Sequence, residues 1–140
     1  MVLDNEALGQ IVAGRPSRPL LVALEAAVAT TGQLLLPTNV VVERRYHPAT
    51  PVAANANRLL RAALHDELTC ARAAEAVRLL VGSNGGPSVV DAHVAAAALA
   101  IVRRNGGTAT IMTSDAGDML RLIDAADDAD ARAAASVQLL

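Results

Sequence analysis

The sequence predicts an α/β protein with a mainly parallel sheet that carries helices on both faces. Short apolar segments bounded by acidic or turn residues alternate with longer segments whose apolar residues recur at helical spacing. Strands that alternate with helices in this way form parallel sheets, and such sheets are covered on both sides. The chain is 53% hydrophobic, yet Tyr46 is its one aromatic residue, so small side chains must fill a core of closely packed layers. The length of 140 residues fits one domain, spanning residues 1–140.

The first half of the chain is expected to hold two strands and four helices. Met1–Asp4 reads as a short strand that ends on an acid, and Leu34–Leu36 reads as a buried strand. The helices are expected at 5–13, at 19–31, from Thr38 or Asn39 to Glu43, and at 53–64. A turn is expected at 48–51, where two prolines lie close together.

The second half is expected to continue the alternation. Strands are predicted at 67–70, 108–113 and 136–140, the last of them at an edge of the sheet. Helices are predicted at 71–81, from 88 to about 104, and at 115–123. The glycines of 82–87 predict a loop, and those of 105–107 predict the end of the longest helix.

Composition excludes several classes of function. The 12 basic residues are all arginines, so a Walker A loop and Schiff-base chemistry are ruled out for want of a lysine. Scarce aromatic residues argue against base-stacking nucleic-acid modules, and a formal charge of −2 argues against binding by bulk charge. Cys70 stands alone and the three histidines are scattered, and we expect the first residues to form a strand rather than a signal peptide. The apolar stretch 19–42 is broken by turn residues, so we expect a cytoplasmic protein without a membrane span.

Four acids follow or begin the expected elements in apolar surroundings, and they can converge at one edge of the sheet. They are Asp4, Glu43, Asp91 and Asp115, with Asp118 as a further acid beside the last. Converged carboxylates repel one another unless a cation neutralises them, and hard oxygen ligands suit Mg²⁺ or Mn²⁺. Such an ion polarises a phosphoryl oxygen and generates a hydroxide nucleophile.

Each acid also has a plain structural interpretation. Asp91 completes a capping box with Ser88, and Asp115 is a good N-cap residue with Asp118 in the first turn. Glu43 fits a solvated helix face beside two arginines. Asp4 is the hardest to explain structurally, because a charge directly after a buried parallel strand has little use there.

Taken together, these segments resemble the PIN-domain family, specifically the VapC-type toxins of bacterial toxin–antitoxin pairs. The resemblance covers nearly the whole chain and rests on four motifs in order: Val2-Leu3-Asp4, Val42-Glu43-Arg44, Val90-Asp91-Ala92 and Thr113-Ser114-Asp115-Ala116-Gly117-Asp118. It implies a PIN-like three-layer α/β/α sandwich with four to five strands. It also implies a Mg²⁺- or Mn²⁺-dependent ribonuclease, frequent homodimers, and inhibition by a cognate antitoxin. One departure is Glu6, where many relatives carry a small hydroxyl residue or Gly.

The resemblance assigns a role to each acid. Asp4, Asp91, Asp115, Asp118 and Glu43 would ligate or orient the metal, and Glu43 would orient or deprotonate the attacking water. We expect the RNA phosphates to meet nearby arginines, for which the candidates are Arg15, Arg18, Arg44 and Arg45. Ordinary surface solubility is the alternative for each arginine. His93 is interpreted as a structural residue, with a catalytic role as the alternative, and Tyr46 as a residue that packs or makes a single contact. Cys70 is interpreted as a small buried hydrophobe.

Three other functions stay open on the sequence. Glu6 could disturb the site and leave a catalytically silent binding module. A metal-dependent phosphatase or a receiver-like signalling domain would suit the fold class, but both commonly need the missing lysine. A nuclease of the same fold acting on DNA is the nearest competitor to a ribonuclease.

Overall fold

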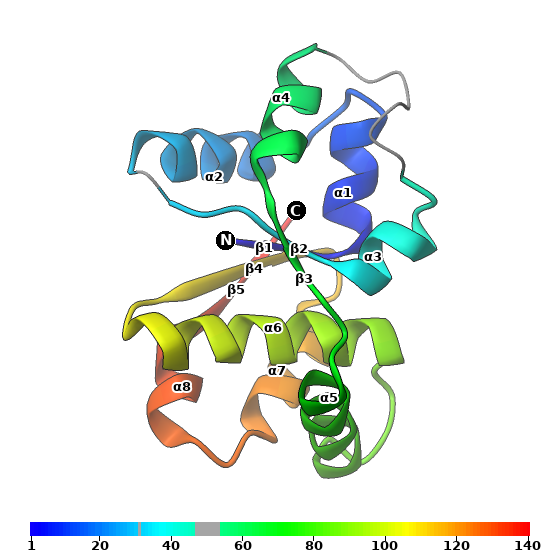
Figure 1. The fold of residues 1–140 in the computed structure, drawn as a ribbon, viewed down its shortest axis with the longest axis vertical. Coiled ribbons are helices and arrows are strands. Elements are labelled where there is room, and N and C mark those ends of the chain that lie inside the picture. Colours follow the sequence, from blue (N-terminus) through cyan, green and yellow to red (C-terminus); the bar gives the residue numbers. More distant parts are fainter. Residues whose placement is uncertain (31, 47–53) are drawn as a thin grey trace.

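A five-stranded, all-parallel sheet forms the centre of the molecule (Figure 1). The computed structural model describes residues 1–30, 32–46 and 54–140. The strands are β1 (Val2–Leu3), β2 (Leu35–Pro37), β3 (Leu64–Asp66), β4 (Ala109–Thr113) and β5 (Ala135–Leu139), and they lie in the order β3-β2-β1-β4-β5. Val2 pairs with Leu35 on one side and with Ile111 on the other, so the shortest strand is central.

Helices cover both faces of this sheet, which makes the three-layer, PIN-like α/β/α sandwich that the sequence predicts. One layer holds α1 (Asn5–Val12), α2 (Arg18–Ala29), α3 (Thr38–Glu43) and α4 (Ala54–Ala62). The other holds α5 (Cys70–Gly82), α6 (Val89–Asn105), α7 (Ala116–Asp124) and α8 (Ala129–Ala134). Figure 1 shows α1, α2 and α4 above the strands and α5 to α8 below them.

Small side chains let α6 lie close against the sheet. Alanines 92 and 95–98 are fully buried, and Val94 and Leu99 are buried with them. A helix that is apolar on nearly all sides belongs in a protein interior. The central strands contribute Val2, Leu3, Leu36, Ile111 and Met112, all fully buried, and successive residues among them face the two helical layers in turn.

Most expected elements are present within one or two residues of the predicted bounds. The strand expected at 67–70 is wrong: β3 covers Leu64–Asp66, and Thr69 instead caps α5 by accepting a hydrogen bond from the Arg72 amide at 3.2 Å. The helix α8 has no counterpart in the prediction, although Asp128 caps it in the same way. The turn expected at 48–51 lies outside the described residues. Among the helices the structure describes, none has the length and apolar character needed to cross a membrane.

The strand order creates a topological switch point between β1 and β4. From β1 the chain first adds β2 and β3 on one side, then crosses to add β4 and β5 on the other. Connections that leave neighbouring strands in opposite directions open a crevice at the carboxyl ends of those strands, where ligands of open α/β sheets bind. Asp4 directly follows β1, and Ser114 and Asp115 directly follow β4.

Candidate functional site

Asp4 is a buried carboxylate at the switch point. It is 6% exposed, its backbone amide donates to the carbonyl of Met112 in β4, and its Oδ1 accepts from the Ala7 amide at 2.7 Å as the N-cap of α1. Burial raises the pKa of Asp4, while hydrogen bonds from the Ala7 amide, the Thr113 side chain and the Ser114 amide lower it. The negative charge of Asp91 raises the pKa further, and the net shift is upward. The fold therefore holds this carboxylate where an anion is costly.

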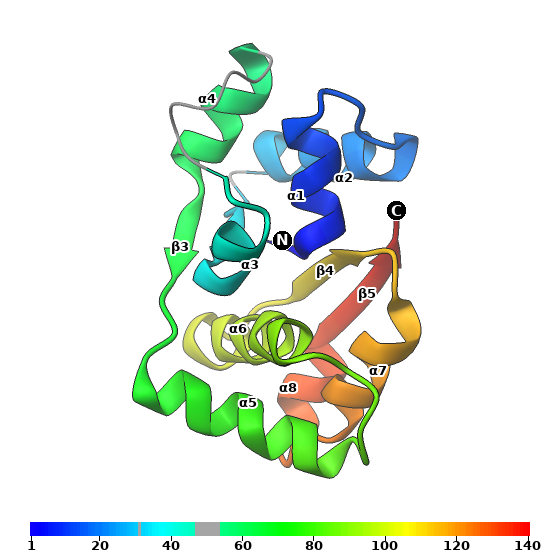
Figure 2. The same cartoon turned by 90° about the vertical axis from the view of Figure 1, so that its right-hand side faces the viewer.

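Asp91 is the acid whose charge acts on Asp4, and it opens α6. Its Oδ2 accepts from the Ser88 amide at 2.9 Å, and its own amide donates to Ser88 Oγ at 3.1 Å. The capping box expected from the sequence is thus present. Because the C-terminus of α6 leads into the start of the parallel strand β4, its N-terminus lies toward the edge of the sheet where the strands end (Figure 2).

Asp115 lies in the turn after β4 and caps α7. Its Oδ1 accepts from the Asp118 amide at 3.1 Å, and its own amide donates to Thr113 Oγ1 at 2.9 Å. Asp118 contacts Arg121 at 3.5 Å, so part of its charge is already compensated. Thr113 is 1% exposed and contacts the acids that follow both central strands, a role the sequence analysis did not assign to it.

Glu43 is exposed at the end of α3, a helix that packs against α1 and α6. The next residue, Arg44, reaches back to α1. Its Nε donates to the Asn5 carbonyl at 3.2 Å, and its Nη2 pairs with Glu6 Oε2, also at 3.2 Å. Glu6 therefore faces Arg44 rather than the acids at the switch point.

The other arginines expected to contact RNA occupy two separate places. Arg15 and Arg18 are exposed beyond the C-terminal end of α1, about 12 Å of helix from Asp4. Arg45 is exposed after α3 with a positive φ of 52°. The structure brings Arg44 and Arg45 near the start of α1 and leaves Arg15 and Arg18 at its far end.

The donor set at the switch point fits a hard divalent cation in its chemistry. Carboxylate oxygens are the ligands that Mg²⁺ and Mn²⁺ prefer, and the raised pKa of Asp4 marks a place where a cation would stabilise the ionised form. Across the described residues, however, no three His, Cys, Asp or Glu side chains are grouped closely enough to hold a metal as they stand. Metal binding here would need side-chain rotations at Asp91, Asp115 or Glu43.

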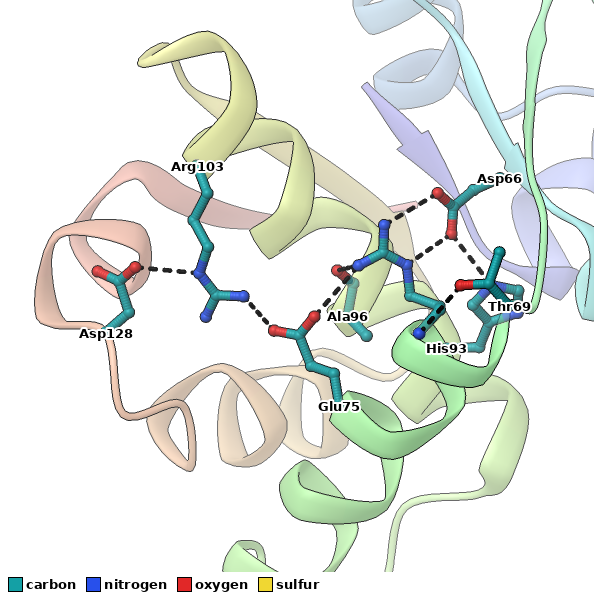
Figure 3. Close-up of polar contacts among 8 residues, drawn as sticks. Asp66, Thr69, Glu75, His93, Ala96, Arg103 and Asp128 are labelled. Carbon is teal, nitrogen blue, oxygen red and sulfur yellow. Dashed lines mark hydrogen bonds and ion pairs between the residues drawn. The ribbon is translucent and has the colours of Figure 1, made fainter.

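A second polar cluster, which no motif in the sequence indicated, lies where α5 and α8 pack against α6 (Figure 3). Arg72 on α5 binds Asp66 at the end of β3 through two hydrogen bonds of 2.9 and 3.1 Å. The same guanidinium donates to Glu75 Oε2 at 3.1 Å and to the Ala96 carbonyl at 3.0 Å. Glu75 also pairs with Arg103 on α6, which in turn binds Asp128 at 3.0 Å. We call these five charged residues the arginine network.

Arg72 and Arg103 neutralise the acids of the arginine network, so the network is structural and not a metal site. His93 is fully buried and contacts Asp66 Oδ2 through Nε2 at 3.1 Å, in agreement with its interpretation as a structural residue. Burial raises the pKa of Asp66, but hydrogen bonds from His93 and Arg72 outweigh it and set the pKa below its ordinary value. The i,i+3 spacing of Arg72 and Glu75 was the signal in the sequence that could have revealed this network.

Two further expectations concern single residues. Tyr46 is 8% exposed and packs in the core, as predicted. Cys70, expected to be a buried hydrophobe, is exposed as the first residue of α5, because the chain reaches that helix from an edge strand.

Solved structures of similar fold include the following two. VapBC2 from Rickettsia felis, bound to a DNA fragment from its promoter, matches with a TM-score of 0.63 and 14% identity over 99% of this chain and 97% of the other. FitAcB from Neisseria gonorrhoeae matches with a TM-score of 0.53 and 16% identity over 98% and 96%. No family model matches the chain. No curated protein matches it either.

These comparisons overturn the assignment of the chain to the VapC-type toxins of the PIN family. The two matching structures are of VapBC and FitAB complexes, and at 14% and 16% identity they show a shared fold without singling out a toxin. The four motifs were too short to carry a family, since each also serves as a helix cap or helix end in this fold. What the comparisons leave is the PIN-like sandwich itself.

Proposed function

We propose that the protein is a divalent-metal-dependent nuclease that hydrolyses RNA phosphodiester bonds at the switch point between β1 and β4. The observation that carries the proposal is Asp4, a buried carboxylate whose pKa is raised by burial and by the charge of Asp91. A buried acid whose hydrogen bonds do not fully offset the cost of burial destabilises the fold, and acids with perturbed pKa values cluster at functional sites. A cation that binds there would remove the cost.

Each residue of the candidate site has its own role in the proposed reaction. Asp4, Asp91 and Asp115, with Asp118 beside them, would hold Mg²⁺ or Mn²⁺, and the bound ion supplies Lewis acidity and a water of lowered pKa. Glu43, exposed at the end of α3, would orient the attacking water and accept its proton on a carboxylate oxygen. Arg45, beside Glu43, would meet phosphate charge. The Thr113 hydroxyl, which hydrogen-bonds to Asp4 and to the Asp115 amide, would hold these two acids in position.

A protein partner belongs to the same proposal. Both matching structures are complexes of toxin–antitoxin systems, and one of them holds promoter DNA. We propose that this chain works with a cognate partner protein that controls its access to RNA. A homodimer is a further expectation that gel filtration with light scattering would check.

The test is cleavage of mixed RNAs by the purified, partner-free protein with Mg²⁺, Mn²⁺ or EDTA. Asp4→Asn is the diagnostic variant, because asparagine also caps helices and should leave α1 intact. Asp127→Asn, which changes an exposed acid outside the site, is the matched control. Metal-dependent cleavage by wild type and control but not by Asp4→Asn supports the proposal. Cleavage that survives Asp4→Asn, or none with either metal from folded protein, refutes it.

A catalytically silent binding module is the second candidate, and one observation favours it. In the residues that the structure covers, the acids do not form a ready-made metal site. Such a module would bind RNA or protein without cleaving it, and added Mn²⁺ would not change its thermal stability. Glu6 gives no support to this alternative, since it pairs with Arg44.

A further inference from the structure

Arg44 differs from the other arginines near the candidate site because its guanidinium is held against α1. It contacts the first turn of that helix at two points, the Asn5 carbonyl and the Glu6 carboxylate, each at 3.2 Å. Its side chain is 34% exposed, so it is neither buried nor free to extend toward a ligand. An arginine held in this way is a poor phosphate contact, because Glu6 already neutralises its charge.

Gly9 supplies the surface on which this guanidinium lies. A Cβ at position 9 would overlap three guanidinium atoms of Arg44 (Nη2, Cζ and Nε). The glycine sits inside α1, where alanine would ordinarily stabilise the helix and no positive φ calls for glycine. The missing side chain therefore has a local reason, which is the close approach of Arg44.

Arg44 lies next to one candidate catalytic acid in the chain and contacts the helix that follows another. Arg44 is the C-cap of α3 and directly follows Glu43, while α1 begins directly after Asp4. The contact therefore ties the end of α3, which carries Glu43, to the helix start that carries Asp4. Beyond Arg44 the backbone turns through a positive φ at Arg45, and Tyr46 then enters the core and donates from its amide to the Val41 carbonyl at 3.0 Å.

We propose that Arg44 is a positioning residue that, lying over Gly9 and paired with Glu6, sets the distance between Glu43 and Asp4. The proposal rests on the nuclease function proposed above. It replaces the expectation that Arg44 contacts RNA. Glu6 is then a positioning residue as well, acting through Arg44.

Kinetics with RNA separate a positioning role from a phosphate contact. Arg44→Ala and Gly9→Ala are both expected to lower kcat about 10- to 100-fold, because small misplacements of catalytic groups have effects of this size. KM should stay within about twofold. Gly9→Ala is the sharper variant, since it displaces the guanidinium and keeps its charge. A phosphate contact would instead raise KM in Arg44→Ala and reduce the slope of log affinity against log salt by about 1.

A double-mutant cycle tests whether Arg44 acts through Glu43. In a Glu43→Gln background, Arg44→Ala and Gly9→Ala should have little further effect on kcat, because the group that they misplace is already disabled. Additive losses would contradict the proposal. Arg78→Ala, which removes an exposed arginine from α5, is the charge-matched control and should leave kcat unchanged.

A distance measurement makes the test independent of RNA and metal. Spin labels at Val42→Cys on α3 and Leu120→Cys on α7, in a Cys70→Ser background, report where α3 lies relative to the sheet; both sites are exposed. Arg44→Ala and Gly9→Ala should shift or broaden the distance distribution, and Arg78→Ala should not. An unchanged distribution in both variants overturns the proposal. If the wild type cleaves no RNA, the nuclease function fails while the distance still decides the role of Arg44.

Discussion

Replacing Glu75 by glutamine is the most informative perturbation of the arginine network. Glu75 is 9% exposed and accepts from two arginines at once, through Oε2 from Arg72 and through Oε1 from Arg103. Glutamine keeps the shape and one carbonyl acceptor. Its amide group, however, presents N–H donors to an arginine that is itself only a donor.

The size of the loss follows from what each arginine retains. Arg72 is 17% exposed and keeps two hydrogen bonds to Asp66, whereas Arg103 is 36% exposed and keeps Asp128. The substitution therefore removes one charge-assisted hydrogen bond, which contributes about 1.5–3 kcal/mol. Because water can replace part of the bond at Arg103, we expect a loss of about 1–2 kcal/mol, below the roughly 3–5 kcal/mol for a broken, fully buried pair.

Urea unfolding followed by far-ultraviolet circular dichroism measures this loss. The midpoint should fall while the m-value stays constant, since the change does not alter the surface exposed on unfolding. Glu25→Gln on α2 is the matched control, because it changes an exposed helical glutamate and should move the free energy of unfolding by less than about 0.5 kcal/mol. Equal midpoints for wild type and Glu75→Gln would refute the assignment of the arginine network as a stabilising feature.

Four further predictions concern charge, accessibility and backbone. The pKa of Asp66 is lowered in the folded state, so its stabilising contribution is present above the unfolded pKa of about 3.9 and is lost as pH falls through the folded pKa. Asp66→Asn should therefore lower the urea midpoint at pH 7, and the midpoint of this variant should fall less between pH 7 and pH 3 than that of the wild type. The pKa of Asp4 is raised in the folded state, so its ionised form at pH 7 lowers the free energy of unfolding, and Asp4→Asn in EDTA should leave stability at pH 7 unchanged or higher. A clear loss of stability would contradict the argument that burial of the ionised Asp4 is costly. Cys70 should react with a thiol reagent in native buffer as fast as in urea, since it is exposed. Gly106→Ala should destabilise the fold by about 1 kcal/mol in thermal unfolding, because Gly106 ends α6 with φ of 63°.

The fold could be predicted because helical spacing and strand length are local properties of this sequence. The long helix from 88 to about 104 was recognisable from its capping box and closing glycines, and α6 spans Val89–Asn105. The strand β3 was misplaced because Leu64 and His65 are exposed in an edge strand, so no buried apolar run marks it. The helix α8 was missed because 129–134 has a low-complexity Ala-rich composition; the Asp128 cap and packing against α6 and β5 stabilise it as a helix.

The sequence could predict only those parts of the candidate site whose positions are set by the ends of strands. Asp4 follows a buried strand, and its position at the switch point follows from the strand order. The partners of charged residues depend on which helices pass one another, which no local pattern contains. Arg44 was therefore interpreted as an RNA contact or an ordinary surface residue, and its contact with Asn5 and Glu6 over Gly9 became visible only in three dimensions.

The capping roles of the acids and their proposed metal-binding roles are compatible. Each cap uses one carboxylate oxygen: Oδ1 of Asp4, Oδ2 of Asp91 and Oδ1 of Asp115. A cap that uses one carboxylate oxygen leaves the other able to accept a further ligand, so capping does not by itself exclude metal binding. Three capped helix starts thus bring these acids to one edge of the sheet, and a metal would bind there only after side-chain rotations. The structural interpretation of each acid therefore does not exclude the site that they would form together.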